Sequence, residues 1–138
     1  MKWITAGVVL LTLGSVGARA QNSQQYRGCT KRALAQMELN ACAGEEAKRV
    51  DAGLNDVYKA LLAAAAGEPN AVAKITAAER AWIAYRDAYM EAMYPAPNKI
   101  SEYGSIYPME ADLLRAELTT QQIKALKDLL KQYRVSKQ

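Results

Sequence analysis

The apolar residues of this chain recur at helical spacing over much of its length. One set follows steps of four, three and four residues: Val50, Leu54, Val57 and Leu61. Such a set lies on one face of a helix, and it predicts a helix from about Ala35 to Ala66 that ends at Gly67 and Pro69. Gly44 and Gly53 lie inside this span and argue against a single unbroken helix.

A second helix is predicted to follow, with Asn70 as its N-cap. Its apolar and aromatic positions recur at steps of three and four residues: Ile75, Ala78, Trp82, Tyr85 and Tyr89. We expect this face to point inward. The prolines of Tyr94-Pro95-Ala96-Pro97-Asn98 end the helix and open a long connection.

The C-terminal part of the chain predicts two more helical segments. Met109 to Glu117 forms a short helix in this prediction, with Pro108 in its first turn. Thr119 and Gln122 resemble a capping box that begins the last helix. The buried stripe of that helix is expected to be Ile123, Leu126, Leu129, Leu130 and Tyr133. No segment alternates apolar and polar residues with period two, so the sequence predicts an all-α protein, a small antiparallel bundle of three to four helices.

The first 20 residues have the composition of a signal peptide. A basic start at Met1-Lys2-Trp3, an apolar run from Ile4 to Val16 and a small-residue site at Ala18-Arg19-Ala20 follow one another. The apolar run is short and interrupted by glycine, which disfavours a membrane span, and an uncleaved N-terminal anchor is the alternative. We therefore expect a periplasmic or secreted protein with a signal peptide over 1–20 and a single helical domain over 21–138, whose first residues, 21–28, form a loose polar segment.

Charge and composition restrict the chemistry. The chain has 18 basic and 14 acidic residues, and because Lys2 and Arg19 lie in the signal segment, the net charge of +4 falls to about +2 after cleavage. No block of like charge indicates a nucleic-acid binder. Histidine is absent, which removes the commonest general base. We expect no enzymatic activity, no metal, no cofactor, no nucleic-acid partner and no membrane span after cleavage; nothing in the sequence indicates an oligomeric state.

Two cysteines remain, Cys29 and Cys42. In an oxidising compartment an even pair favours a disulfide, which we expect here. A zinc site is disfavoured because the usual histidine ligands are missing and two thiolates alone hold zinc poorly, and a redox pair would normally have the closer C-x-x-C spacing.

Polar residues gather on the predicted faces of the first two helices. Asp51, Asn55, Arg86 and Asp87 could line a polar pocket, or they could form a buried network that fixes helix packing, with Arg86 four residues from Trp82. We favour the structural network.

The segment from Tyr94 to Tyr107 mixes tyrosines with small polar residues and a lysine, as recognition surfaces do. Its candidate partner-binding residues are Tyr94, Lys99, Tyr103, Ser105 and Tyr107. The alternative, which we favour, is an ordinary long connection whose tyrosines pack back onto the bundle.

Four fragments together resemble the LprI-like family of lysozyme inhibitors, a family of small secreted domains. They occur in the expected order over most of the chain: Glu38-Leu39-Asn40-Ala41-Cys42-Ala43, Asp51 through Leu54-Asn55 to Tyr58, Arg80-Ala81-Trp82-Ile83-Ala84-Tyr85-Arg86-Asp87, and Gly104-Ser105-Ile106-Tyr107-Pro108-Met109. The resemblance implies a helical envelope domain that binds lysozyme. Family members often carry a second cysteine pair, where this chain has Met90 and Leu113 or Leu114. Because both cysteines are missing together, the resemblance supports pairing Cys29 with Cys42 and suggests that apolar packing replaces the second bond.

Three functions remain open at this point. The first is an exported inhibitor that occludes the substrate cleft of a peptidoglycan hydrolase, with Lys99 pairing a catalytic carboxylate. The net charge of about +2 counts against it, because host lysozymes are usually strongly basic, unless the fold gathers a local acidic patch. The others are an envelope structural, adaptor or immunity-type protein that binds another exported protein, and a bundle that binds a small molecule near Trp82.

Overall fold

The computed structural model describes residues 23–135, which form five helices and no strand. The predicted all-α fold is confirmed. The helices are α1 Gln24–Thr30, α2 Gln36–Ala64, α3 Pro69–Met93, α4 Lys99–Tyr103 and α5 Tyr107–Val135. The predicted signal peptide over 1–20 lies outside the described residues. Among the helices of residues 23–135, none is long and apolar enough to cross a bilayer.

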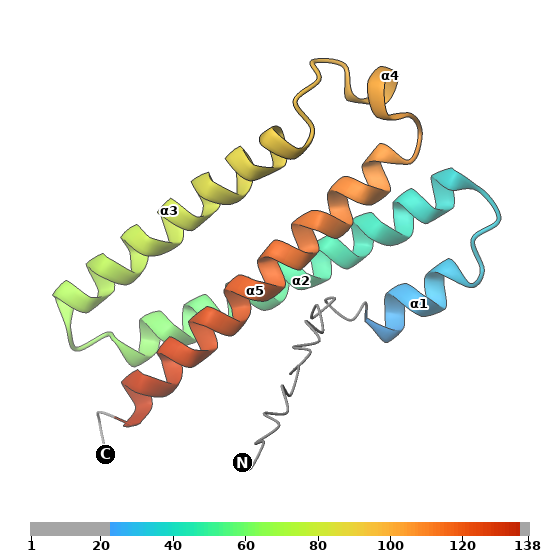
Figure 1. Cartoon of the computed structure of the whole chain (residues 1–138). Helices are drawn as coiled ribbons and strands as arrows, with labels where there is room; N and C mark the ends of the chain where they lie inside the picture. The colour runs from blue at the N-terminus through green and yellow to red at the C-terminus, as the bar shows by residue number, and fades with distance from the viewer. Residues whose placement is uncertain (1–22, 136–138) are drawn as a thin grey trace, which may run out of the picture.

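Three long helices make up the bundle, and each runs antiparallel to the one before it (Figure 1). Because α3 runs back along the bundle before α5 begins, α2 and α5 run parallel. These two helices form the principal interface among the described helices. Their shared core contains the apolar sets predicted for both helices, except Val50, which is half-buried outside this cluster. Its buried members are Leu54, Leu61, Ala65, Ile75, Leu126 and Leu130.

Helix α2 is continuous, so the expectation that its glycines interrupt it is wrong. Both glycines face α5 instead. A Cβ atom on Gly53 would lie 3.6 Å from Cδ1 of Ile123, and one on Gly44 would lie 3.4 Å from Oδ2 of Asp112. The cost of glycine within a helix is about 1 kcal/mol each, and the burial of the α2–α5 interface outweighs it.

Helix α3 begins at Pro69 with Glu68 as its N-cap residue, so Asn70 is not the cap. Proline fits this first position because its missing N–H would be unpaired there. The predicted inward face is only partly correct. Ile75 is buried and Trp82 is half-buried, but Tyr85 is 56% exposed and Tyr89 is exposed beside it. The buried residues of α3 are Ile75, Glu79 and Met90. Tyr85 and Tyr89 lie beside this buried stripe rather than on it, because their positions are rotated away from it about the helix axis.

Helix α5 is also continuous, which corrects the prediction of a short helix followed by a capped one. Pro108 lies in its first turn as predicted, but Thr119 is fully buried in mid-helix. Gln122 does not cap the helix; its Nε2 donates to Oε2 of the buried Glu79 at 2.8 Å and ties α5 to α3. The stripe predicted for this helix, Ile123 to Tyr133, is confirmed as buried or half-buried.

Residues 23–28 are ordered into the first helix, so the loose segment expected there is wrong. Ser23 caps α1 by accepting from the backbone N–H of Tyr26, and Tyr26 packs in a buried cluster with Cys42. The predicted disulfide between Cys29 and Cys42 is confirmed, with the two Cα atoms 5.8 Å apart. Helix α1 is therefore fastened to α2 by a covalent bond as well as by packing.

Apolar contacts occupy the region where the resemblance implies a second cysteine pair in other members. Met90 of α3 is buried in a cluster with Ala111 and Leu118 of α5, and Leu114 packs against the same cluster. This contact joins the end of α3 to α5 near the long connection.

Candidate partner-binding site

Three tyrosines meet where α3, α4 and α5 are connected. Tyr94 follows the last residue of α3, Tyr103 ends α4, and Tyr107 begins α5. The ring centroid of Tyr94 lies 5.4 Å from that of Tyr103 and 5.0 Å from that of Tyr107, both edge to face. Tyr103 and Tyr107 are 5.9 Å apart. Each contact has the geometry that favours aromatic pairs, so the cluster gives the connection a fixed shape.

Lys99 links the end of α3 to the start of α4 through three hydrogen bonds. Its Nζ donates to Oε2 of Glu91 at 2.8 Å, to the carbonyl oxygen of Tyr94 at 2.7 Å and to that of Ala96 at 3.4 Å. The hydrogen bond to Glu91 raises the pKa of Lys99 above its ordinary value. The three hydrogens of the ammonium group therefore all have acceptors within the protein.

The tyrosine side chains contribute polar contacts of their own. The hydroxyl of Tyr103 accepts from the backbone N–H of Ala96 at 3.1 Å. Burial raises the pKa of Tyr94, and the nearby charge of Glu110 adds to the rise. Tyr94 is thus a neutral hydrogen-bonding group at physiological pH.

A sharp turn between α4 and α5 completes the surface. Gly104 has a φ of +76°, a backbone conformation that residues with a Cβ atom rarely adopt. The carbonyl oxygen of Ser105 accepts from Nδ2 of Asn40 on α2 at 3.0 Å. The exposed Ser105 is therefore held against the start of α2.

Large apolar side chains also lie exposed on the segments that meet at this end of the long helices, and sequence reasoning missed them because they stand outside the helical stripes predicted to be buried. They are Leu34, Met37, Met93, Ile100 and Ile106. Figure 1 shows α4 and the α1–α2 connection at the same end of the long helices. A contact of 3.9 Å between Nε2 of Gln36 and Sδ of Met109 agrees with this placement. We call residues 34–37 and 93–107 together the tyrosine end.

The connection is also locally acidic. Residues 91–110 contain three acids, Glu91, Glu102 and Glu110, against the single cation Lys99, which leaves a net charge of −2. Glu102 and Glu110 are exposed. An apolar, tyrosine-rich surface with acidic groups fits a basic protein partner.

The polar residues of α2 and α3 are brought together away from this end. The guanidinium of Arg86 lies 5.2 Å from the ring centroid of Trp82, 3.0 Å from Oδ1 of Asp87 and 3.7 Å from Oδ1 of Asp51 on the facing helix. Asn55 donates only to the carbonyl oxygen of Asp51, at 3.1 Å.

The network lies at the surface rather than in the core. The Arg86 side chain is 15% exposed, whereas both aspartates are largely exposed. A neighbouring cavity of about 330 Å³ also includes Asp112 and Arg115, which pair with each other at 2.7 Å. These charges are paired within the protein, but the network expected to be buried lies at the surface.

Tyr94 and Tyr107 also pack against the buried cluster of Met90, Ala111 and Leu118, so these two tyrosines lie back on the bundle. Residues 29–126 match the family model described as lysozyme inhibitor LprI. The chain belongs to this family of lysozyme inhibitors. A similar curated protein is an uncharacterized protein of Rhizobium meliloti (strain 1021), 34% identical over 121 residues that cover 79% of this chain and 84% of the relative. No solved structure matches the chain.

Proposed function

We propose that this protein, after export and cleavage near Gln21, inhibits a lysozyme-type peptidoglycan hydrolase by covering its substrate cleft with the tyrosine end. The observation that carries the proposal is the coincidence, at one end of the bundle, of exposed apolar side chains and a packed tyrosine cluster, within a connection whose residues 91–110 carry a net charge of −2. Membership of the family supplies the class of target.

Rigidity supports the inhibitory role. The tyrosine cluster, the Lys99 hydrogen bonds and the bond from Asn40 to Ser105 hold the connection in one shape before any partner binds. A surface that is already ordered loses little conformational entropy on binding, which favours tight association. Tyrosine also contributes large contact area at low entropic cost.

The net positive charge of the chain counts against a basic partner, and the local charge of the connection answers this objection. Steering of a partner depends on the charge of the surface that it meets, and exposed charges more than about 8 Å apart are largely screened at physiological ionic strength. The net charge of −2 on residues 91–110 is complementary to a basic hydrolase, although the chain as a whole is basic.

Inhibition in this proposal requires no covalent chemistry. Ile100 and Ile106 bury apolar surface in the cleft, while the hydroxyl groups of Tyr103 and Ser105 are placed to hydrogen-bond its polar residues. Lys99 has a positioning role, because its hydrogens already bind Glu91 and two carbonyl oxygens. Pairing between Lys99 and a catalytic carboxylate would require these bonds to break.

The test is a lysozyme inhibition assay with direct binding measured alongside. The wild-type protein should bind at least one of c-, g- and i-type lysozymes at micromolar concentration or below and reduce its activity. Tyr103→Ala and Tyr107→Ala should weaken inhibition while the circular dichroism of the helices stays unchanged. Absence of binding to all three types would refute the proposal. Loss of helicity in both variants would assign the tyrosines to folding instead.

A further inference from the structure

A second surface lies at the opposite end of the molecule, where α2 and α5 finish (Figure 1). There the two helices enclose an open groove of about 480 Å³. Its floor is apolar and includes Val57 of α2 with Leu130 and Val135 of α5. Val135 is 63% exposed at the open end of the groove. An exposed apolar floor of this kind costs solvation free energy unless another molecule covers it.

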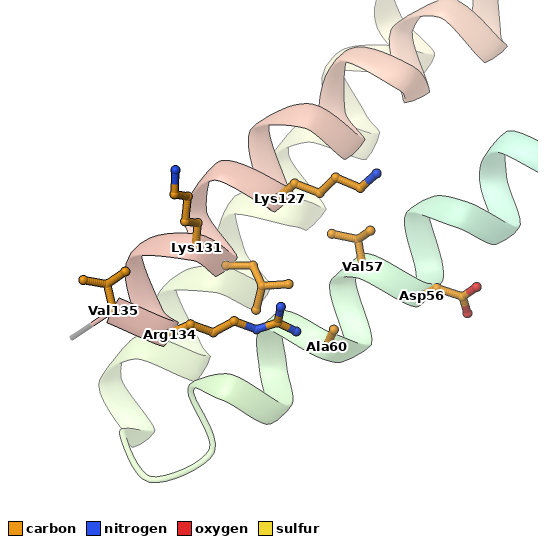
Figure 2. Close-up of a pocket in the computed structure, with 8 residues that line it drawn as sticks. Asp56, Val57, Ala60, Lys127, Lys131, Arg134 and Val135 are labelled. Atoms are coloured by element: carbon orange, nitrogen blue, oxygen red, sulfur yellow. The ribbon is translucent and has the colours of Figure 1, made fainter. Parts of the chain in front are cut away.

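Cations border this floor. Figure 2 shows Lys127 and Lys131 on the α5 side of the groove and Arg134 extending toward Ala60 of α2. All three are exposed, and none makes an ion pair or a side-chain hydrogen bond with another residue of the described chain. Asp56 is the single acid that lines the groove.

The cations form a line rather than a cluster. Lys124 extends the same row, so the basic positions follow steps of three, four and three residues along one side of α5. Ten residues of helix span about 15 Å. Residues 124–135 carry four cations and one acid, Asp128, and therefore a net charge of +3. A row of this length matches several anions side by side better than one anion held at a point.

We propose that this basic groove docks on the surface of a bilayer that contains anionic phospholipids. Lysine attracts a phosphate as a point charge, and arginine can bind two of its oxygens at once. Headgroup phosphates then lie along the row from Lys124 to Arg134, and the apolar floor contacts the glycerol and upper acyl region beneath them. Charge complementarity and the row's length favour a lipid surface over an acidic peptide.

Docking in this way sets the orientation of the protein. Because the row runs along the side of α5, docking lays the axis of α5 along the bilayer, and the tyrosine end, at the opposite end of α5, lies beyond the docked segment. The two surfaces can therefore be occupied together. The docking proposal does not depend on inhibition, and either one can fail alone.

The test is cosedimentation of the full chain with vesicles at physiological salt. Vesicles of phosphatidylglycerol and phosphatidylcholine are compared with vesicles of phosphatidylcholine alone. The test variant is Lys127→Gln/Lys131→Gln/Arg134→Gln. The control, Lys31→Gln/Lys74→Gln/Arg80→Gln, removes the same charges from exposed positions outside the groove. Both variants keep the wild-type N-terminus, so differences between them report on the groove.

The wild-type chain should bind the anionic vesicles and not the neutral ones. Each cation near an anionic surface contributes roughly 5-fold to partitioning, so the groove variant should lose about 100-fold. The control should lose less than about 5-fold, because screening weakens charges far from the surface. The charge-conserving variant Lys127→Arg/Lys131→Arg should bind the anionic vesicles as well as the wild-type chain does.

Three outcomes would overturn the proposal. The first is no wild-type binding to anionic vesicles. The second is an equal loss in both triple variants, which would mean attraction by net charge alone. The third is binding to polyglutamate without binding to vesicles, which would make the groove a site for acidic polypeptides.

Discussion

Asn40 of α2 donates a hydrogen bond from Nδ2 to the carbonyl oxygen of Ser105, 65 residues later in the chain, at a distance of 3.0 Å. This bond ties the turn before α5 to the first helix of the main interface. It therefore determines where Ile106 and Tyr107 lie relative to Leu34 and Met37. The two halves of the tyrosine end form one surface partly because of it.

Asn40→Ala should weaken inhibition by roughly 5-fold, which corresponds to the loss of the hydrogen bond to Ser105, worth about 1 kcal/mol, because the second bond of Asn40, accepted from Gln36, lies within α2. The measurement is the inhibition constant, with circular dichroism to confirm that the helices are intact. Asn55→Ala is the matched control, since Asn55 is also on α2 but donates within its own helix. An equal effect of the two substitutions would contradict the role of the bond to Ser105.

Leu61 and Trp82 test how the core is distributed. Leu61 of α2 is fully buried, at 0% exposure, in the core that α2 shares with α5. Trp82 of α3 is half-buried, with the guanidinium of Arg86 over its ring. Leu61→Ala should lower the free energy of unfolding by about 3–4 kcal/mol, and Trp82→Ala by about 2 kcal/mol, below the range for a fully buried tryptophan. Chemical denaturation measures both. A larger loss for Trp82→Ala would place the centre of the core on α3 instead.

Gly53→Ala should stabilise the protein. The new methyl group would lie 3.6 Å from Cδ1 of Ile123, an ordinary contact distance, and alanine removes the conformational cost of glycine within a helix. The expected gain in the free energy of unfolding is about 0.5–1 kcal/mol, measured by thermal or chemical denaturation. Destabilisation would show that α2 and α5 are too close there for any side chain.

Glu46 links the stability of α1 to pH. Burial raises the pKa of this carboxyl group, but hydrogen bonds from Ser23 and Arg49 outweigh it and hold the pKa below its ordinary value of 4.5. A lowered pKa in the folded state stabilises the protein above about pH 4.5, and this contribution is lost as pH falls through the folded pKa. The attachment of Ser23 to α2 should therefore weaken in acid.

Glu46→Gln should lower the free energy of unfolding by about 1–2 kcal/mol at neutral pH, and its difference from wild type should shrink below about pH 4. Thermal denaturation across this pH range measures the difference, and hydrogen exchange at Tyr26 localises it to α1. Glu45→Gln is the control, because Glu45 pairs only with the exposed Lys48. A difference that stays constant from neutral to acid pH would contradict the assignment.

The sequence predicts the long helices well because their buried residues follow helical spacing. Leu54 and Leu61 on α2, and Leu126 and Leu130 on α5, lie in the core as their spacing indicates. The disulfide follows from the number of cysteines and the expected compartment. The resemblance to the lysozyme inhibitor family, drawn from four fragments, is confirmed by the match over residues 29–126.

The errors arise where tertiary packing overrides a local signal. Thr119 and Gln122 have the spacing of a helix start, but burial of Thr119 and the bond from Gln122 to Glu79 keep α5 continuous. The burial of the charged Glu46 beneath Ser23 and Arg49 is likewise set by contacts across the fold and within α2. A local sequence pattern cannot predict contacts such as Gln122 with Glu79 or Ser23 with Glu46, because the two residues of each pair are far apart in the chain.

The candidate site is only partly predictable for the same reason. The tyrosines of 94–107 are conspicuous in the sequence, but their assembly with Leu34 and Met37 depends on the parallel packing of α2 and α5. The basic groove is missed because its cations are separated by three and four residues and form no block of like charge. Only the helix brings Lys127, Lys131 and Arg134 to one side.

The most direct test of the central claim, that the tyrosine end is the inhibitory surface, compares two isoleucines of equal exposure. Ile106 lies at the tyrosine end and is 38% exposed, whereas Ile83 lies mid-way along α3 and is 39% exposed. The measurement is the inhibition constant of Ile106→Asp and Ile83→Asp against a lysozyme that the wild type inhibits. The account predicts a loss of at least about 10-fold for Ile106→Asp, because a charge would be buried in the interface, and little change for Ile83→Asp. Unchanged inhibition by Ile106→Asp together with a loss in Ile83→Asp would place the inhibitory surface on α3 and contradict the account.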